Sequence, residues 1–172
     1  MALNGNLLSA NDESVETDIS GWSAGGNTTL TQSTTHALDG THSLRLASTT
    51  SGTISAGVTN RLTGITAGAL YGWYYWLFTT VQITAHVEID WYTATTYIST
   101  TIGNTLTIPA NTWTQVGAPM VAVATTQQCV PLIVIDANAS SQLFYTDEMF
   151  FGRWINPSLT ATRQAVKRAA FY

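Results

Sequence analysis

Charged residues, cysteine and long apolar runs are all scarce in this sequence. Charged side chains make up 9% of its 172 residues, and Cys129 is the only cysteine. One cysteine excludes an intrachain disulfide, and its apolar neighbours favour a small buried hydrophobic side chain. No stretch approaches the roughly 20 apolar residues of a membrane span, so we expect no membrane partner. The N-terminus has no basic region followed by an apolar block, so we expect no secretory signal.

Hydrophobic residues nevertheless reach 45%, which gives a single domain enough apolar surface for a core. With so few charges, the surface must be built largely from threonine, serine, asparagine, glutamine and glycine. Threonine is β-branched and suits the half-buried positions of a pleated sheet. The composition therefore favours a β-rich domain with a weakly charged surface.

The two ends of the chain differ in charge. All 10 acidic residues lie in residues 1–152 beside only Arg45 and Arg61, which gives that part a net charge of −8. Residues 153–172 carry no acid and four basic residues, Arg153, Arg163, Lys167 and Arg168. A basic tail on an acidic body is expected to dock either on an acidic surface of its own oligomer or on a partner. Because no phosphate-binding glycines lie among these cations, we do not expect nucleic-acid binding.

Apolar or alternating segments recur at fairly even intervals, separated by glycine, asparagine or serine. They include Ser43–Ala47, Thr53–Val58, Leu70–Phe78, Val81–Thr93 and Cys129–Ile135. Thr95–Thr107 predicts two further strands joined by a hairpin turn at Gly103. Pro131 indicates that the Cys129–Ile135 strand is an edge strand or carries a bulge. The pattern predicts an all-β fold, a jelly-roll β-sandwich.

Two of these predicted strands carry most of the candidate binding residues. Leu70–Phe78 is aromatic on both faces, which predicts one face in the core and the other at a groove or an interface. Val81–Thr93 alternates, so its apolar set, which includes Trp91, faces the core, and its polar set faces solvent or a ligand. The candidate glycan or interface residues are Trp73, Tyr75, His86, Glu88, Asp90, Tyr92 and Trp113. The alternative is that most of these rings lie in the core or at a subunit interface.

A late segment, Leu143–Gly152, is a strongly apolar strand pattern that contains two adjacent carboxylates, Asp147 and Glu148. We expect the glycine to end the strand. Burying an unpaired charge costs several kcal/mol, and the chain offers few cations. A metal ion shared with the N-terminal segment is one partner for Asp147. The alternative is that Asp147 faces water at a strand end.

Several segments resemble, in order, the carbohydrate-binding modules of families 4/9 and 22. Their opening is similar to Asn6-Leu7-Leu8, followed by Asn11, Val15-Glu16 and Gly21-Trp22. Their Gly-x-x-Ser-Leu turn resembles Asp39-Gly40 with Ser43-Leu44. Their later landmarks are similar to Val87-x-Ile89-x-Trp91-Tyr92, Thr112-Trp113, Ala118-Pro119 and Tyr145-x-Asp147-Glu148.

This resemblance, over roughly residues 4–152, implies a jelly-roll sandwich with a structural calcium ion. The ligands would be Glu16, backbone carbonyl groups from Asp39 to Ser43, and Asp147, all of them the hard oxygens that calcium prefers. The sequence has Val15 where the family has phenylalanine, with an apparent one-residue insertion. Glu13 therefore remains an alternative to Glu16.

The chain changes character after Gly152. Residues 154–157 predict an extended linker, because the residue before Pro157 avoids the helical region, and Ser158–Ala170 predicts a helix capped by Ser158. We therefore divide the chain into a carbohydrate-binding-module-like sandwich, residues 1–152, and a basic docking arm, residues 153–172. The partner-docking residues are Arg153, Trp154, Arg163, Lys167 and Arg168.

We do not expect an enzyme. His36, His42 and His86 lack a metal-ligand spacing, and the sequence has no Ser-His-Asp motif or phosphate-binding glycine loop. Glu88 and Asp90 lie about 7 Å apart on one strand face, and nothing supplies a cleft that would separate their pKa values.

Two non-catalytic functions remain. Free-standing domains that resemble these modules and carry a C-terminal extension are familiar in tailed phages. The first hypothesis is therefore a phage virion structural protein, a capsid decoration, collar or minor tail component, assembled in the host cytoplasm. It would contact other capsid or tail proteins and form a homo-oligomer. The alternative is a glycan-binding module of a polysaccharide-active or host-adsorption protein.

Overall fold

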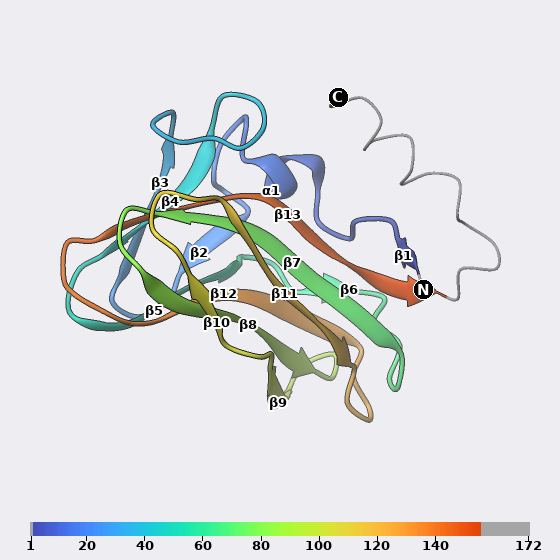
Figure 1. Cartoon of the computed structure of the whole chain (residues 1–172). Helices are drawn as coiled ribbons and strands as arrows, with labels where there is room; N and C mark the ends of the chain where they lie inside the picture. The colour runs from blue at the N-terminus through green and yellow to red at the C-terminus, as the bar shows by residue number, and fades with distance from the viewer. Residues whose placement is uncertain (1, 156–172) are drawn as a thin grey trace.

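Two antiparallel β-sheets pack face to face in the computed structural model, which describes residues 2–155 (Figure 1). The first sheet has the order β11 (Thr114–Val121), β7 (Leu70–Thr79), β13 (Leu143–Ile155), β4 (Ser43–Ser48) and β3 (Thr28–Ser33), with β1 (Ala2–Asn4) added to β13. The second has the order β10 (Leu106–Ile108), β8 (Ile83–Tyr92), β12 (Gln128–Asn138), β5 (Gly52–Val58) and β2 (Trp22–Ala24). Two further strands join it: β9 (Tyr97–Ile102) pairs with β8, and β6 (Leu62–Thr63) with β12. The predicted all-β jelly-roll sandwich is confirmed.

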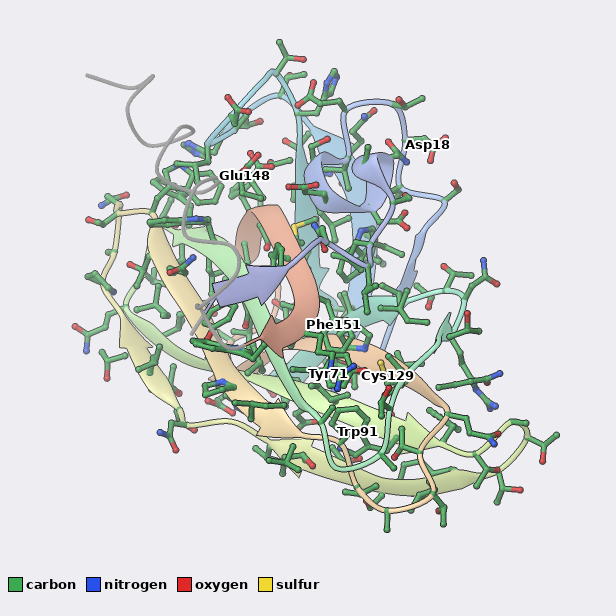
Figure 2. All side chains as sticks on the ribbon, turned by 90° about the vertical axis from the view of Figure 1, so that its right-hand side faces the viewer. Asp18, Tyr71, Trp91, Cys129, Glu148 and Phe151 are labelled. Atoms are coloured by element: carbon green, nitrogen blue, oxygen red, sulfur yellow. The ribbon has the colours of Figure 1, made fainter. Side chains whose placement is uncertain are left out.

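Alternating side chains on the facing sides of the two sheets form the core. On β8 the apolar set predicted to face inward is buried, and Trp91 is fully enclosed. Tyr71 stacks on Phe151 with ring centroids 5.5 Å apart, and Trp91 packs against Tyr71 at 6.5 Å. Figure 2 shows these three side chains gathered close to Cys129, which is buried as predicted. The long central strands therefore have an inner face committed to the core and an outer face available for other roles.

Strand β13 changes faces partway along its length. Phe144 and Thr146 are buried on the inner side, and Met149 and Phe151 take over that side after a register shift between Asp147 and Phe150. Glu148 adopts a positive φ of 50° at this point. The bulge inserts extra backbone into the strand, so strict alternation between the two faces does not hold through residues 143–151.

Gly152 does not end β13, contrary to the sequence-based expectation. The strand continues to Ile155 and pairs with β1 beyond the glycine. A Cβ atom at Gly152 would lie 2.4 Å from the carbonyl oxygen of Gly5. The glycine is therefore required for the close approach of the N-terminal segment, and the boundary predicted at residue 152 falls inside a strand.

Two details of strand pairing also differ from expectation. Strands β9 and β10 both pair with β8 and do not form a hairpin with each other. Pro131 lies within β12, which is flanked by β8 on one side and by β5 and β6 on the other. On the side of β12 away from β8, residues 128–129 pair with β6 and residues from 132 onward pair with β5. Pro131 lies between these two stretches, so its missing N–H removes no hydrogen bond between strands on that side.

A short helix near the N-terminus, α1 (Ala10–Ser14), was not predicted. The hydroxyl oxygen of Ser9 caps it by accepting a hydrogen bond from the backbone N–H of Asp12 at 3.0 Å. The spacing of Ser9 and Asp12 was the available signal for it. The predicted helix at Ser158–Ala170 lies outside the described residues. Within residues 2–155, no helix is long and apolar enough to cross a membrane.

Candidate functional site

Asp147 is fully buried at the bulge of β13, beneath the turn that joins β3 to β4. Its Oδ2 atom accepts hydrogen bonds from the backbone N–H groups of Leu38 at 2.8 Å and Asp39 at 3.1 Å. Its Oδ1 atom accepts one from the N–H of Glu148 at 2.8 Å. Burial raises the pKa of Asp147, although these three amides act to lower it, and the negative charge of Glu16 raises it further.

Glu16 reaches the same turn from the segment that follows α1. Its Oε1 atom accepts hydrogen bonds from the N–H groups of Thr41 at 3.0 Å and His42 at 2.9 Å. Its Oε2 atom accepts one from the Thr41 hydroxyl at 2.9 Å and lies 3.2 Å from Nδ1 of His42. Burial acts to raise the pKa of Glu16, but the hydrogen bonds from His42 and Thr41 outweigh it and lower the pKa to about 2.

The turn itself is shaped to receive the glutamate. Gly40 has a φ of +64°, and a Cβ atom there would lie 2.4 Å from Oε1 of Glu16. Only glycine combines this backbone conformation with the required space. The Ser43 hydroxyl donates to the carbonyl oxygen of His36 and so closes the turn.

The structure therefore brings the two expected acids to one turn. Glu16, and not Glu13, holds it, because Glu13 lies within α1. The alternative that Asp147 faces water is wrong, because its side chain is buried.

The oxygens of the two acids already have hydrogen-bond partners at this turn. Calcium takes six to eight oxygen ligands. Both oxygens of Glu16 already face two donors each, and Asp147 accepts three backbone N–H groups. Among the residues that the structure describes, no group of three or more His, Cys, Asp or Glu side chains is placed to hold a metal. The calcium ion, with Glu16, Asp39, Ser43 and Asp147 as its site, stays a prediction from the sequence resemblance.

Two aromatic residues proposed for binding lie in the core. Trp73 and Tyr75 are fully buried. The indole N–H of Trp73 donates to the carbonyl oxygen of Leu132 at 2.8 Å, and the Tyr75 hydroxyl donates to that of His86 at 2.9 Å. Their polar ends thus support the backbone of the second sheet from beneath. Assigning these rings to a binding surface was wrong, because β7 turns this set of its side chains inward.

The polar candidates of β8 do share one surface, the outer face of the second sheet. His86, Glu88, Asp90 and Tyr92 alternate with the buried apolar set of the same strand. Opposite them on β12 lie apolar side chains, with Val130 facing Asp90, Leu132 facing Glu88 and Val134 facing His86. We call this surface the polar face. It combines a row of hydrogen-bonding groups with a neighbouring row of aliphatic ones.

His86 links two carboxylates at one end of the polar face. Its Nε2 atom lies 2.9 Å from Oε1 of Glu88, and its Nδ1 atom lies 3.0 Å from Oδ1 of Asp136. The imidazole is nine-tenths buried, so these contacts fix its ring. Asp136 was not among the predicted site residues. No local pattern marks it, because it meets His86 only through the pairing of β12 with β8.

The far end of the polar face carries an aromatic residue. The Arg61 guanidinium lies 3.8 Å from the ring centroid of Tyr92, and the Tyr97 ring packs edge-on against it at 5.6 Å. The hydroxyl of Thr100, which lies on the adjoining strand β9, donates a hydrogen bond to the carboxylate of Asp90. Burial raises the pKa of Tyr92, the charge of Asp90 adds to this, and Arg61 acts to lower it.

The remaining candidates lie elsewhere. Trp113 packs against Phe78 at 5.6 Å on the outer side of the first sheet, away from the polar face. Arg153 is exposed and Trp154 half-buried, both near the end of β13. Arg163, Lys167 and Arg168 lie outside the described residues.

No family model matches this sequence, and no curated protein matches it. Solved structures do resemble it. The CBM22-1 xylan-binding domain of Paenibacillus barcinonensis Xyn10C superimposes with a TM-score of 0.70 at 13% identity, covering 89% of this chain and 97% of that one.

Two larger proteins contain a similar domain. The CBM22-1–GH10 modules of Clostridium thermocellum endo-1,4-beta-D-xylanase 10B, complexed with xylohexaose, give a TM-score of 0.65 at 18% identity, covering 82% of this chain and 28% of that one. The enzymatically active domain of bacteriophage CBA120 tailspike protein 4 gives 0.62 at 14% identity, covering 87% and 21%. This chain therefore spans a minor part of both. At such identities the likeness establishes the fold alone: a jelly roll of the kind found in carbohydrate-binding modules.

Proposed function

We propose that the protein is a non-catalytic glycan-binding module and that the polar face of the second sheet receives the glycan. The observation that carries this proposal is the pairing of two rows on that face. Hydrogen-bonding side chains run along β8, and aliphatic side chains run beside them along β12. A sugar ring presents hydroxyl groups at its edge and C–H groups on its face, so it matches both rows. The similarity of the fold to xylan-binding domains supports the same function.

Binding without catalysis is part of this proposal. His86 is held between Glu88 and Asp136, and Asp90 accepts a hydrogen bond from Thr100. These groups stabilise one another in fixed positions. Fixed carboxylates that accept hydrogen bonds from sugar hydroxyls are suited to recognition.

The experiment is a screen of soluble oligosaccharides, xylohexaose included, followed by calorimetric titration of those that bind. Asp90→Asn is expected to weaken binding by roughly tenfold to a hundredfold, which is the loss of one charge-assisted contact. Tyr92→Ala removes the aromatic ring at the end of the same face and should also weaken binding. Gln115→Ala is the matched control. Gln115 is exposed on the outer side of the first sheet and should leave affinity unchanged. Failure of every glycan to bind at millimolar concentration would contradict the proposal.

A virion structural role is the second candidate. It is supported by the presence of a similar domain within a bacteriophage tailspike protein, which links the fold, and only the fold, to a virion. Mass spectrometry of purified particles and the oligomeric state of the isolated chain test it. An obligate oligomer found in particles favours the virion role, and a monomer that binds soluble glycans favours the module.

Calcium binding is a separate proposal that rests on the sequence resemblance alone. For calcium to bind Asp147 and Glu16, the turn amides would first have to release carboxylate oxygens. If an ion is bound, EDTA should lower the melting temperature, and Asp147→Ala should abolish that sensitivity. A melting temperature that EDTA does not change would contradict calcium binding, and the backbone amides of the turn would then be the partners of both acids.

A further inference from the structure

The outer side of the first sheet carries a cluster of aromatic side chains, which we call the aromatic face. Its members are half-buried and come from β7, β13 and the residue just before β11; they are Tyr74, Trp76, Phe78, Trp113, Phe150 and Trp154. Pairing places Phe150 opposite Tyr74, so the two strands contribute to one surface. Aromatic side chains bury large apolar areas, so a cluster that is only partly buried leaves apolar surface that another segment could cover.

The turn above Asp147 covers one end of this face. The His36 ring stacks on Phe78 at 4.2 Å and packs edge-on against Tyr145 at 4.7 Å. Trp113 packs on the other side of Phe78 at 5.6 Å. Among the described ring contacts, none covers Trp76 or Phe150, which lie farther along the sheet.

The chain itself supplies a segment that begins at this face. Strand β13 carries Phe150 and Trp154 and ends at Ile155, from which residues 156–172 continue. Those residues, when extended at about 3.3 Å each, reach farther than the length of β7. A segment tethered so close to a surface has an effective concentration in the millimolar range, so even a weak contact is populated.

The charges of the two parts are complementary. Residues 156–172 contain Arg163, Lys167 and Arg168 and no acid, whereas the described residues contain all 10 acids and only three arginines. Glu148 lies on β13 at the bulge (Figure 2), and α1, with Asp12 and Glu13 in its first turn, packs against the same strand. Acidic groups thus lie on or against the strand that carries Phe150 and Trp154.

We propose that residues 156–172 dock on the aromatic face of their own chain. Apolar side chains such as Leu159 and Val166 would cover Trp76 and Phe150, and the basic side chains would lie toward Glu148 and α1. This surface is on the opposite side of the sandwich from the polar face, so the proposal does not depend on glycan binding.

The test is a spin label on the full chain, attached through Ala165→Cys. The Cys129 thiol is buried, and burial raises its pKa, so it does not react with the label. The label therefore attaches to the cysteine introduced at position 165. Paramagnetic broadening of tryptophan indole N–H signals is then measured against a diamagnetic label. We expect the strongest broadening at Trp76, Trp113 and Trp154, and weaker broadening at Trp91, whose N–H donates to Thr101 on the second sheet.

Two variants and one mixing experiment make the outcome decisive. Trp76→Ala should reduce the broadening of the remaining signals on this face, and Tyr97→Ala, which removes an exposed ring from the second sheet, should not. Uniform or absent broadening would overturn the proposal. In the mixing experiment, an isotope-labelled chain without a spin label is combined with a spin-labelled second copy. If its signals broaden as strongly as they do within one labelled chain, the proposal is also overturned, because the segment on the face would then belong to another molecule.

Discussion

The two outer faces of this sandwich are built for different tasks, although both lie on antiparallel sheets of similar size. The outer side of the first sheet carries aromatic rings and is closed at one end by a turn that Asp147 and Glu16 hold through backbone amides. The outer side of the second carries His86, Glu88 and Asp90 in a row beside aliphatic side chains. Substitutions on the first side should therefore change stability, and substitutions on the second should change ligand binding.

The largest expected effect is that of Asp147→Ala. It removes the acceptor of three backbone N–H groups in a buried position. Each buried donor left without a partner costs about 1–3 kcal/mol, so we expect a loss of at least about 3 kcal/mol and a melting temperature lower by roughly 10 °C. Thermal unfolding checks this, with Asp147→Asn as the control that retains one acceptor oxygen. The glycan affinity of the folded fraction should not change. A loss of affinity in the folded protein would show that the first sheet also takes part in ligand binding.

A pair of glycine substitutions compares the two sides directly. A Cβ atom at Gly117 would lie 2.0 Å from Cδ1 of Tyr74, whereas one at Gly57, on the polar face, would lie 3.1 Å from Cγ1 of Val130. Gly117→Ala should destabilise the fold by about 1–3 kcal/mol, and Gly57→Ala by less than about 1 kcal/mol. Chemical denaturation measures both. Equal losses would show that the Tyr74 ring does not occupy the space that we describe.

Acid should weaken the turn through Glu16. Its pKa is lowered to about 2 in the folded state from an ordinary value of 4.5, so its contribution to stability is complete above pH 4.5 and is lost as the pH falls toward 2. The raised pKa of Asp147 acts in the opposite sense, because a protonated Asp147 is favoured in the folded state. The stability difference between the wild type and Glu16→Gln, measured by urea unfolding, should therefore shrink between pH 4.5 and 2. A constant difference would show that the Glu16 carboxylate does not hold the turn.

The smallest effect is expected at the end of the polar face. Arg61→Ala removes the guanidinium that lies 3.8 Å from the Tyr92 ring centroid. A partly exposed cation–π contact contributes about 0.5–1 kcal/mol, so the melting temperature should fall by only a few degrees. Differential scanning calorimetry measures this, with Arg45→Ala on the first sheet as a comparison. A larger loss at Arg61 would mean that the polar face also supports the fold.

Much of the fold was predictable because alternation and turn residues are local signals. The inward set of β8 followed from a period of two, and the jelly roll followed from the number and spacing of the strands. The bulge at Asp147 was not predictable, because its positive φ at Glu148 belongs to no residue type that marks such a conformation. The pairing of β9 and β10 with β8 was missed because adjacent strands usually form hairpins.

The candidate site was predictable only in part. The meeting of Glu16 and Asp147 at one turn followed from a sequence resemblance, but the nature of their partners did not. Counting side-chain cations pointed to a metal ion as one partner for Asp147. It did not consider backbone N–H groups, which every residue except proline carries and which donate hydrogen bonds to both acids here. The contact of Asp136 with His86 depends on strand register, which the sequence of either strand alone does not encode.

The claim that the second sheet carries the ligand is tested most directly by mapping backbone amide chemical shifts as a binding oligosaccharide is added. The account predicts shifts concentrated on β8, β12 and β5, with β7 and β11 unaffected. Shifts concentrated on β7 and β11, or no shifts at millimolar oligosaccharide, would contradict it.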